Sequence, residues 1–146
     1  MPRGARRLPD GCLALLERAG LLVHTGDFTA AAVHEELTRY GRLAAVHGNM
    51  DEWPLREALP ERLVVEEAGV RIGVVHDPGS RDGRHERLRT WFPDADVIAY
   101  GHTHLPEVAR YGDAWIVNPG SPTERRRAPG HTLAVLVDGI PELIRV

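Results

Sequence analysis

Five short apolar segments in this chain are each followed at once by a polar side chain that could bind a ligand. The polar residues are Asp27 after "LLVHTG", Asn49 after "RLAAVHG", His76 after "IGVV", His102 and His104 after "VIAYG", and Asn118 after "WIV". A short apolar run bounded by turn residues predicts a buried strand. In open α/β sheets, ligands bind beyond the carboxyl ends of the strands, and glycines there let the chain turn sharply. The pattern therefore predicts that these side chains meet at one edge of a sheet.

The order of helical and strand patterns predicts the fold class. Helices are expected over 10–20, 28–41 and 84–92, and a loop over 50–61. Hairpins are expected to turn near Ala68–Gly69, Gly112 and Asp138–Gly139. Strands that alternate with helices and are followed by hairpins favour an α/β fold with a mixed sheet or two packed sheets. A chain of 146 residues is expected to form a single domain, residues 1–146.

Composition argues against several classes of function. The net charge of -3 and the pI near 6.2 give no basic field with which to grip long nucleic acid, although small anionic ligands remain compatible. Cys12 is the single cysteine, so no internal disulfide can form. No run reaches the roughly 20 apolar residues of a membrane span, and no signal peptide is evident. These features predict a cytoplasmic protein without a membrane partner.

The types of residue at the strand ends indicate metal chemistry. One carboxylate, one amide and three imidazoles form a nitrogen and oxygen donor set that suits Mn, Fe, Co, Ni or Zn better than Ca²⁺. A carboxylate flanked by histidines on both sides favours a two-metal site for phosphoryl transfer. An isolated His-x-His is more often a pair of surface residues. The prediction of a metal site therefore rests on the whole ordered set of strand-end residues. A nucleophilic enzyme is disfavoured because neither Ser121 nor Cys12 is paired with a base and no G-x-S-x-G is present.

The motifs "HTGD", "HGNMD", "VVHD", "GHTH" and "NPGSPT", in this order, resemble the calcineurin-like metallophosphoesterase superfamily, most closely its small bacterial and archaeal phosphodiesterases. The resemblance covers nearly the whole chain. It implies a two-sheet α/β sandwich with a dinuclear centre, most often filled by Mn²⁺, with Fe, Ni, Co or Zn as alternatives. It implies further that Asp27 bridges both ions, that Asn49, His76 and His102 complete the second site, and that His104 belongs to the first.

The sequence departs from the family pattern at its start. Similar members begin with an apolar strand that ends in D-x-H and supplies two ligands of the first metal, whereas here Met1 leads directly into "PRGARRLPDG". Either the sequence begins at an internal start, which is the favoured interpretation, or the lineage has lost its first site. We expect one metal per chain, in the second site. We also expect an edge of "LLVHTG" without a partner strand, and hence a tendency toward homo-oligomers.

The resemblance implies hydrolysis of phosphate esters, with phosphodiesters favoured, by a metal-bound hydroxide acting on a small phosphoester substrate. Arg125 is predicted to present its guanidinium to the substrate phosphate, and Asn118 is predicted to contact the substrate as well. Asp51 is expected either to support the site or to start a turn or helix. The alternative function is a non-catalytic scaffold or binding protein with a degraded first site, as is known for one subunit of a membrane-sorting complex in this family.

Overall fold

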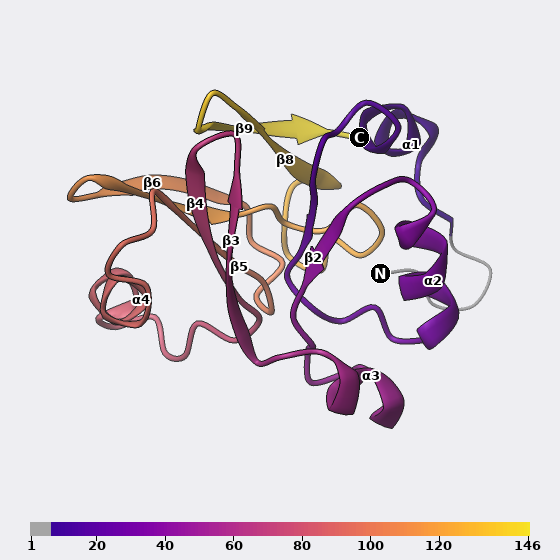
Figure 1. The fold of residues 1–146 in the computed structure, drawn as a ribbon, viewed down its shortest axis with the longest axis horizontal. Coiled ribbons are helices and arrows are strands. Elements are labelled where there is room, and N and C mark those ends of the chain that lie inside the picture. Colours follow the sequence, from indigo (N-terminus) through magenta and orange to yellow (C-terminus); the bar gives the residue numbers. More distant parts are fainter. Residues whose placement is uncertain (1–6) are drawn as a thin grey trace.

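A five-stranded mixed sheet lies at the centre of the fold, which the computed structural model describes for residues 7–146 (Figure 1). Its strands, in spatial order, are β3 (Arg62–Glu67), β4 (Val70–Val75), β5 (Val97–Tyr100), β7 (Ala114–Asn118) and β6 (Glu107–Tyr111). β4, β5 and β7 run parallel, while β3 and β6 are antiparallel edge strands. The carboxyl ends of the three parallel strands therefore lie at one edge, as predicted.

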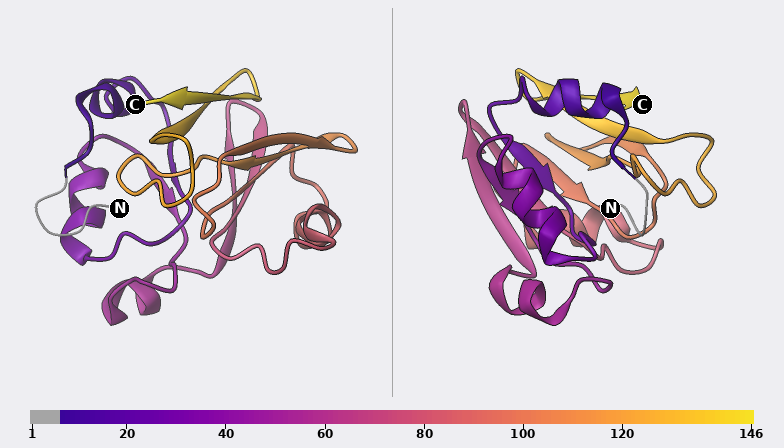
Figure 2. Two further views of the ribbon diagram at one scale, coloured as in Figure 1. Left: turned by 180° about the vertical axis from the view of Figure 1, so that it is seen from behind. Right: turned by 90° about the vertical axis from the view of Figure 1, so that its right-hand side faces the viewer.

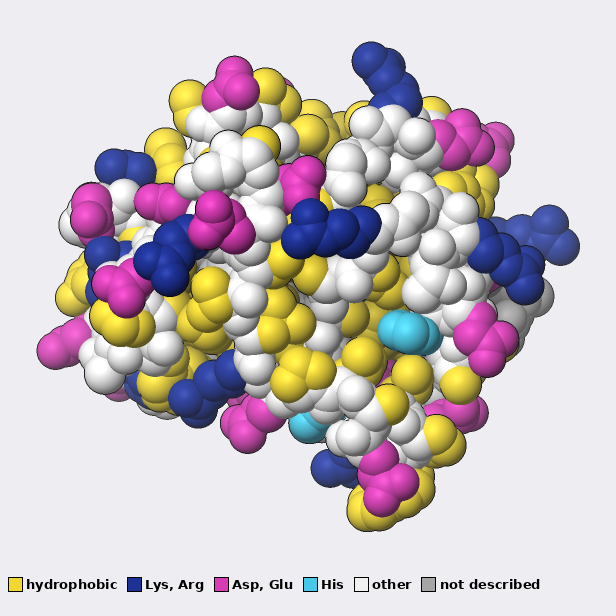
Figure 3. All heavy atoms as spheres, viewed as in Figure 1, with side chains coloured by type: hydrophobic (Ala, Val, Ile, Leu, Met, Phe, Trp, Pro, Cys, Tyr) yellow, Lys and Arg dark blue, Asp and Glu magenta, His cyan; other side chains and the backbone are white. Residues whose placement is uncertain are grey.

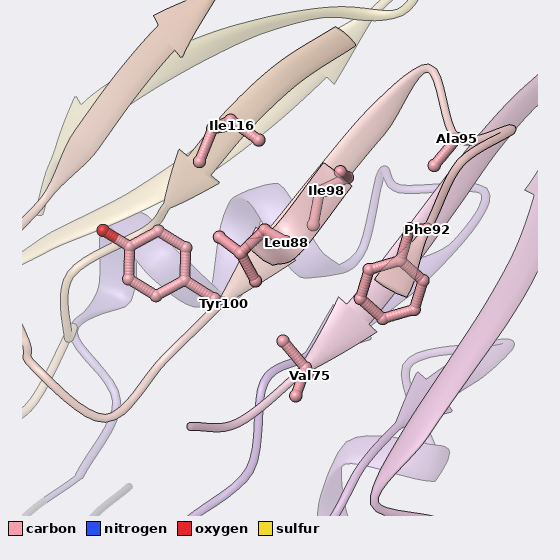
Figure 4. Close-up of a cluster of buried hydrophobic side chains, with 7 residues drawn as sticks. All are labelled: Val75, Leu88, Phe92, Ala95, Ile98, Tyr100 and Ile116. Carbon is pink, nitrogen blue, oxygen red and sulfur yellow. The ribbon is translucent and has the colours of Figure 1, made fainter. Parts of the chain in front are cut away.

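One face of this sheet packs against α4 (Arg84–Trp91). Because side chains alternate along a strand, Val75, Ile98 and Ile116 share this face and contact Leu88 of α4 (Figure 4). Leu88, Ile98 and Ile116 are 0% exposed, so this cluster forms one half of the core. Gly73 belongs to the same packing, since a Cβ there would lie 2.5 Å from the ring of Phe92. The sheet therefore holds α4 close to its strands.

Two small sheets cover the opposite face. One pairs β1 (Leu22–His24) with β2 (Leu43–Ala45) in parallel, and the other pairs β8 (Thr132–Val137) with β9 (Ile140–Arg145) in antiparallel. Val23, Ala134 and Leu136 from these sheets pack against the apolar cluster of Val74 and Val97. The predicted mixed α/β fold with two packed layers is confirmed. Within residues 7–146, however, the second layer is divided, since β1 pairs only with β2 and β8 only with β9.

Three helices lie beside β1 and β2, on the side away from the central sheet (Figure 2). They are α1 (Asp10–Leu16), α2 (Ala31–Thr38) and α3 (Trp53–Ala58). Phe28, Leu37, Ala45 and Leu55 form the apolar cluster between these helices and the small sheet. No helix in the part of the chain that the structure describes is long and apolar enough to cross a bilayer.

The secondary structure agrees with the sequence predictions except in three segments. The hairpins at Ala68–Gly69, Gly112 and Asp138–Gly139 and the helix after Gly83 are confirmed. The helices predicted over 10–20 and 28–41 are shorter, at Asp10–Leu16 and Ala31–Thr38. The loop predicted over 50–61 is wrong, because it contains α3. A proline in the first turn is compatible with a helix, since the N–H that it lacks has no partner there in any case.

Candidate metal centre

Four of the predicted site residues lie together, and we call them the Asn49 cluster: Asp27, Asn49, His76 and His102. The Oδ1 atom of Asn49 lies 3.0 Å from Nε2 of His76 and 3.1 Å from Nδ1 of His102. The two ring nitrogens lie 3.3 Å apart, and Nε2 of His76 lies 3.5 Å from Oδ2 of Asp27. Asp27 and Asn49 follow β1 and β2 of a small sheet, whereas His76 and His102 follow β4 and β5 of the central sheet. The four residues therefore converge as predicted, but where two sheets adjoin and not at one edge of a single sheet. Their role as metal ligands stays a prediction.

A hydrogen bond to Thr25 fixes the tautomer of His76 and shows which ring nitrogen is an acceptor. Nδ1 of His76 lies 2.7 Å from the carbonyl oxygen of Thr25. A carbonyl can only accept, so Nδ1 carries the proton and Nε2 presents a lone pair. That lone pair faces the amide oxygen of Asn49 and the carboxylate of Asp27, which are also acceptors. Nδ1 of His102 lies 3.1 Å from the Asn49 oxygen and 3.3 Å from Nε2 of His76, so it can donate to these acceptors when no ion is bound. In the other tautomer of His102 the same atom would present a lone pair to an ion.

The spacing of these atoms fits a common ion. Donor atoms bound about 2.1 Å from one ion in tetrahedral geometry lie about 3.4 Å from one another. The distances within the cluster run from 3.0 to 3.5 Å. Among the described residues, no group of three or more His, Cys, Asp or Glu side chains is arranged to hold an ion. A site at this edge therefore requires the Asn49 amide in addition to the ionisable side chains.

His104 lies in the same cavity as Asp27 and His102 but has a different partner. Its Nδ1 donates to the carbonyl oxygen of Glu124 at 2.6 Å. Burial lowers the pKa of His104 below its ordinary value, so the neutral ring with a free Nε2 lone pair is favoured. The structure therefore keeps His104 near the Asn49 cluster but anchors it to a separate loop. That His104 binds the first of the two metal ions stays a prediction.

Asp51 supports the cluster by fixing two loops. Its carboxylate accepts hydrogen bonds from the backbone N–H groups of Gly48 at 2.7 Å, Asp27 at 3.1 Å and Thr29 at 2.8 Å. The N–H of Met50 donates in turn to Oδ1 of Asp27 at 2.8 Å, which leaves Oδ2 on the side of His76. Asp51 is 6% exposed, so these bonds are shielded from water. Of the two roles expected for Asp51, the structure favours support of the site.

The backbone at the site is held in an uncommon conformation. Asp27, His102 and His104 have φ values of 63°, 64° and 59°, in the left-handed region that non-glycine residues rarely occupy. The close approach of Gly48 to Asp27 adds a second constraint, because a Cβ at Gly48 would lie 2.1 Å from Oδ1 of Asp27. At Asp27 and His102 these turns aim the side chain at the cluster immediately after the strand ends, whereas His104 is directed to the carbonyl oxygen of Glu124.

His24 stabilises the turn that leads to Asp27. Its Nδ1 accepts a hydrogen bond from the N–H of Gly26 at 3.1 Å, and its ring stacks on Phe28 with 3.7 Å between ring centroids. Burial lowers the pKa of His24 well below its ordinary value. The ring is therefore neutral at neutral pH, as its role as an acceptor requires.

The two residues predicted to bind substrate have different environments. Asn118 is 0% exposed, donates to Oγ1 of Thr103 at 2.9 Å and accepts from the N–H of Gly120 at 2.9 Å. In this placement Asn118 supports the loop that carries His102. Its predicted contact with the substrate stays a prediction. Arg125 is exposed, as expected of a surface contact. The neighbouring Arg126 donates to the carbonyl oxygen of His102 at 3.1 Å, a contact that no sequence pattern indicated.

Comparison with known proteins identifies the family. The family model described as the calcineurin-like phosphoesterase superfamily domain matches residues 4–138. A probable metallophosphoesterase of Methanothermobacter thermautotrophicus is 30% identical over 141 residues, which are 95% of this chain and 81% of that protein.

Two solved structures share the fold. Vps29 of Entamoeba histolytica, crystallised in complex with Zn²⁺, superposes with a TM-score of 0.73 at 23% identity, over 100% of this chain and 93% of that one. An archaeal phosphodiesterase superposes with a TM-score of 0.71 at 22% identity, over 92% of this chain and 87% of that one. At these identities the likeness concerns the fold alone, whereas the family model covers nearly the whole chain. The chain therefore belongs to the calcineurin-like phosphoesterase superfamily, whose members bind divalent metal ions.

Proposed function

We propose that this protein hydrolyses phosphate esters, with phosphodiesters as the favoured class, by means of a divalent ion held at the Asn49 cluster. The observation that carries the proposal is the convergence of oxygen and imidazole nitrogen atoms from Asp27, Asn49, His76 and His102 at contact distances of 3.0 to 3.5 Å. Membership of a phosphoesterase superfamily supports the same reaction class. The solved structure of an archaeal phosphodiesterase with this fold is compatible with it.

The ion would be held by Oδ2 of Asp27, Oδ1 of Asn49, Nε2 of His76 and Nδ1 of His102. Oxygen and imidazole donors suit Mn²⁺, which we propose as the preferred ion, and also Fe, Ni, Co and Zn. When bound, such an ion lowers the pKa of water and neutralises charge on a phosphoryl oxygen. The Thr25 carbonyl holds the ring of His76 in the tautomer that such binding needs.

Other residues of the chain would orient the substrate. We propose that the exposed guanidinium of Arg125 contacts the substrate phosphate, since arginine presents paired donors to such oxygens. Arg126 touches the His102 loop directly and is the competing candidate for this contact. The neutral ring of His104 adds a further acceptor at the wall of the same cavity.

The second candidate function is a scaffold that binds metal without turnover. The position of His104 favours the scaffold, because His104 bonds to the carbonyl oxygen of Glu124 and lies outside the Asn49 cluster. Few described side chains would then be left for a second ion. The fold shared with Vps29 is compatible with this alternative.

The test combines Mn²⁺ titration calorimetry with turnover of bis(p-nitrophenyl) phosphate. Wild-type protein should bind about one Mn²⁺ per chain and hydrolyse the ester, and His76→Ala should lose both properties. His85→Ala is the matched control, since His85 lies on α4 and pairs with Glu107 at 2.9 Å, away from the cluster. Binding without turnover would favour the scaffold. Equal Mn²⁺ affinity in wild type and His76→Ala would exclude the proposed site.

A further inference from the structure

β3 lies at one end of the central sheet and, within residues 7–146, pairs with β4 alone (Figure 1). The hairpin that joins the two strands turns at Ala68 and Gly69, whose φ values of 49° and 78° are typical of a two-residue turn. Such a turn is flanked by a pair that exchanges backbone hydrogen bonds, here Glu67 and Val70. Bonded and non-bonded pairs alternate along an antiparallel ladder. Every second residue of β3 therefore directs its N–H and C=O groups away from β4.

These outward backbone groups belong to Arg62, Val64 and Glu66. A side-chain contact agrees with this assignment, because the guanidinium of Arg42, which precedes β2, donates to the carbonyl oxygen of Glu66 at 3.2 Å. Among the described residues, no backbone carbonyl outside β4 accepts from the N–H of Val64. An open edge of this kind can pair with a further strand.

Arg62, Val64 and Glu66 also share one face of the sheet, since side chains alternate along a strand. It is the face that carries α4, because the guanidinium carbon of Arg62 lies 3.7 Å from the centre of the Trp91 ring of that helix. Val64 is 56% exposed, and both charged residues are exposed as well. Along the edge this face presents a positive, an apolar and a negative side chain in order. A rotation of 180° about Val64 reverses the order, so the row is complementary to a rotated copy of itself.

An antiparallel pair of β3 strands centred on Val64 matches both the backbone and the side chains. Val64 then faces Val64 of the second copy, and Arg62 and Glu66 of one copy face Glu66 and Arg62 of the other. Each of these residues directs its N–H and C=O at the residue that it faces, as bonded pairs require. Opposite charges directly across two strands are favourable, whereas like charges are not. The Glu66 carbonyl oxygen has two lone pairs, so it can accept from the second copy while Arg42 stays bound.

Other arrangements of the two strands fit less well. A parallel pair in register would place Arg62 beside Arg62 and Glu66 beside Glu66 of the second copy, so that like charges meet. An antiparallel pair shifted by two residues would set Arg62 against Val64 and leave Glu66 without an opposite charge. A strand of another protein could also add to this edge, but β3 itself already supplies the length and the reversed order of charges.

We propose that β3 is the interface of a twofold homodimer, in which the two central sheets join edge to edge. Such an interface closes on itself, because each copy uses up the edge that it presents. Pairing of β3 with the other edge strand, β6, would instead continue from copy to copy into a filament. The residues of the Asn49 cluster take no part, so the dimer does not depend on the ester hydrolysis proposed above.

Sedimentation equilibrium of the full chain tests for the dimer and for its backbone hydrogen bonds. Wild-type protein should show a monomer–dimer equilibrium with a dissociation constant below about 500 µM. Val64→Pro removes an N–H that points away from β4, so β3 and β4 keep their bonds while dimerisation should weaken about tenfold or more. Val64→Thr is the matched control, since it keeps the N–H and a β-branched side chain and should change the affinity less than about threefold.

Exchange of charges tests the antiparallel register. Arg62→Glu and Glu66→Arg should each be monomeric, because like charges would then face each other at both ends of the interface. A mixture of these two variants should form a dimer with an affinity near that of wild type, since every charge again faces an opposite one. Arg39→Glu, exposed at the carboxyl end of α2, is the control and should dimerise like wild type. Thermal melting would verify that each variant is folded.

Three results would overturn the proposal. The first is a wild-type dissociation constant above about 500 µM. The second is a dimer that Val64→Pro leaves intact, since the interface would then lie elsewhere. The third is a mixture of Arg62→Glu and Glu66→Arg that stays monomeric although both variants are folded.

Discussion

Asp51 accepts a hydrogen bond from the backbone N–H of Asp27, a residue that precedes it by 24 positions in the sequence. The same carboxylate binds the N–H groups of Gly48 and Thr29, so it joins the loop after β1 to the loop after β2. Asp27 and Asn49 lie on these two loops and both belong to the Asn49 cluster. One buried carboxylate therefore fixes the relative positions of two candidate ligands.

We expect Asp51→Asn to weaken Mn²⁺ binding about 10- to 100-fold, as is typical when a group that orients metal ligands is lost. The amide retains one acceptor oxygen but directs an NH₂ group at a backbone N–H that Asp51 now satisfies. The free energy of unfolding should fall by about 1 to 3 kcal/mol. Asp94→Asn, at an exposed position, is the control and should change neither quantity. An unchanged Mn²⁺ affinity in Asp51→Asn would show that the loops hold Asp27 by themselves.

Gly48→Ala should abolish Mn²⁺ binding while leaving most of the fold intact. The added Cβ would lie 2.1 Å from Oδ1 and 2.4 Å from the backbone nitrogen of Asp27, so both the carboxylate and the loop that carries it must move away from His76. Gly11→Ala is the matched control, since a Cβ at Gly11 has no neighbour within 4 Å. Gly11 lies in α1, where alanine should raise stability by up to about 1 kcal/mol. Calorimetric titration and thermal melting of both variants would check the prediction, and full Mn²⁺ affinity in Gly48→Ala would contradict it.

His24 should make the protein less stable below about pH 6.5. Its folded-state pKa is well below its ordinary value because burial disfavours the charged ring. In this pH range the unfolded chain binds a proton that the folded chain does not bind, so the free energy of unfolding falls as the pH falls. Above the unfolded pKa this contribution is constant.

The measurement for His24 is urea denaturation at several pH values between about 5 and 8, with His24→Asn as the comparison. Asparagine offers an acceptor to the N–H of Gly26 and does not titrate. The difference in stability between wild type and His24→Asn should change by up to about 1.4 kcal/mol per pH unit below the unfolded pKa. Parallel pH profiles for the two proteins would rule out the assignment.

Substitution of the two exposed arginines should distinguish their roles in substrate binding. We expect Arg125→Ala to raise the KM for the phosphodiester about tenfold with little effect on Mn²⁺ affinity, since a lost charged hydrogen bond corresponds to about 1.5 to 3 kcal/mol. Arg126→Ala, in contrast, should lower Mn²⁺ affinity, because Arg126 donates to the carbonyl oxygen of His102 and so orients the loop that carries this residue. Steady-state kinetics and calorimetry on both variants would test this. A raised KM in Arg126→Ala alone would transfer the substrate contact to Arg126.

Surface charge bears on the class of substrate. On the face shown in Figure 3, arginine side chains alternate with acidic ones and form no continuous basic surface. A small phosphoester needs only a local cation, whereas a long nucleic acid requires many phosphate contacts. Turnover should therefore depend only weakly on salt concentration, and kinetics from about 50 to 200 mM salt would check this. A steep loss of activity with salt would point to a polyanionic substrate.

The sequence alone determined those features that depend on short stretches of chain. Apolar runs with a glycine and a polar residue at their ends specified the strands and placed Asp27, Asn49, His76 and His102 at carboxyl ends of strands, because a strand's carboxyl end is fixed by the order of its own residues. That these ends belong to two adjoining sheets was not evident from the sequence. Glycine-containing turns specified the hairpins in the same way.

The tertiary structure alone decided the features that rest on contacts between distant residues. The bond of Asp51 to the Asp27 backbone, the burial of Asn118 and the contact of Arg126 with His102 each join segments at least 15 residues apart. The cavity lined by β1 and β8 likewise depends on how two strands far apart in the sequence are placed. No local pattern encodes such contacts, since they exist only once packing against the central sheet has brought the loops together.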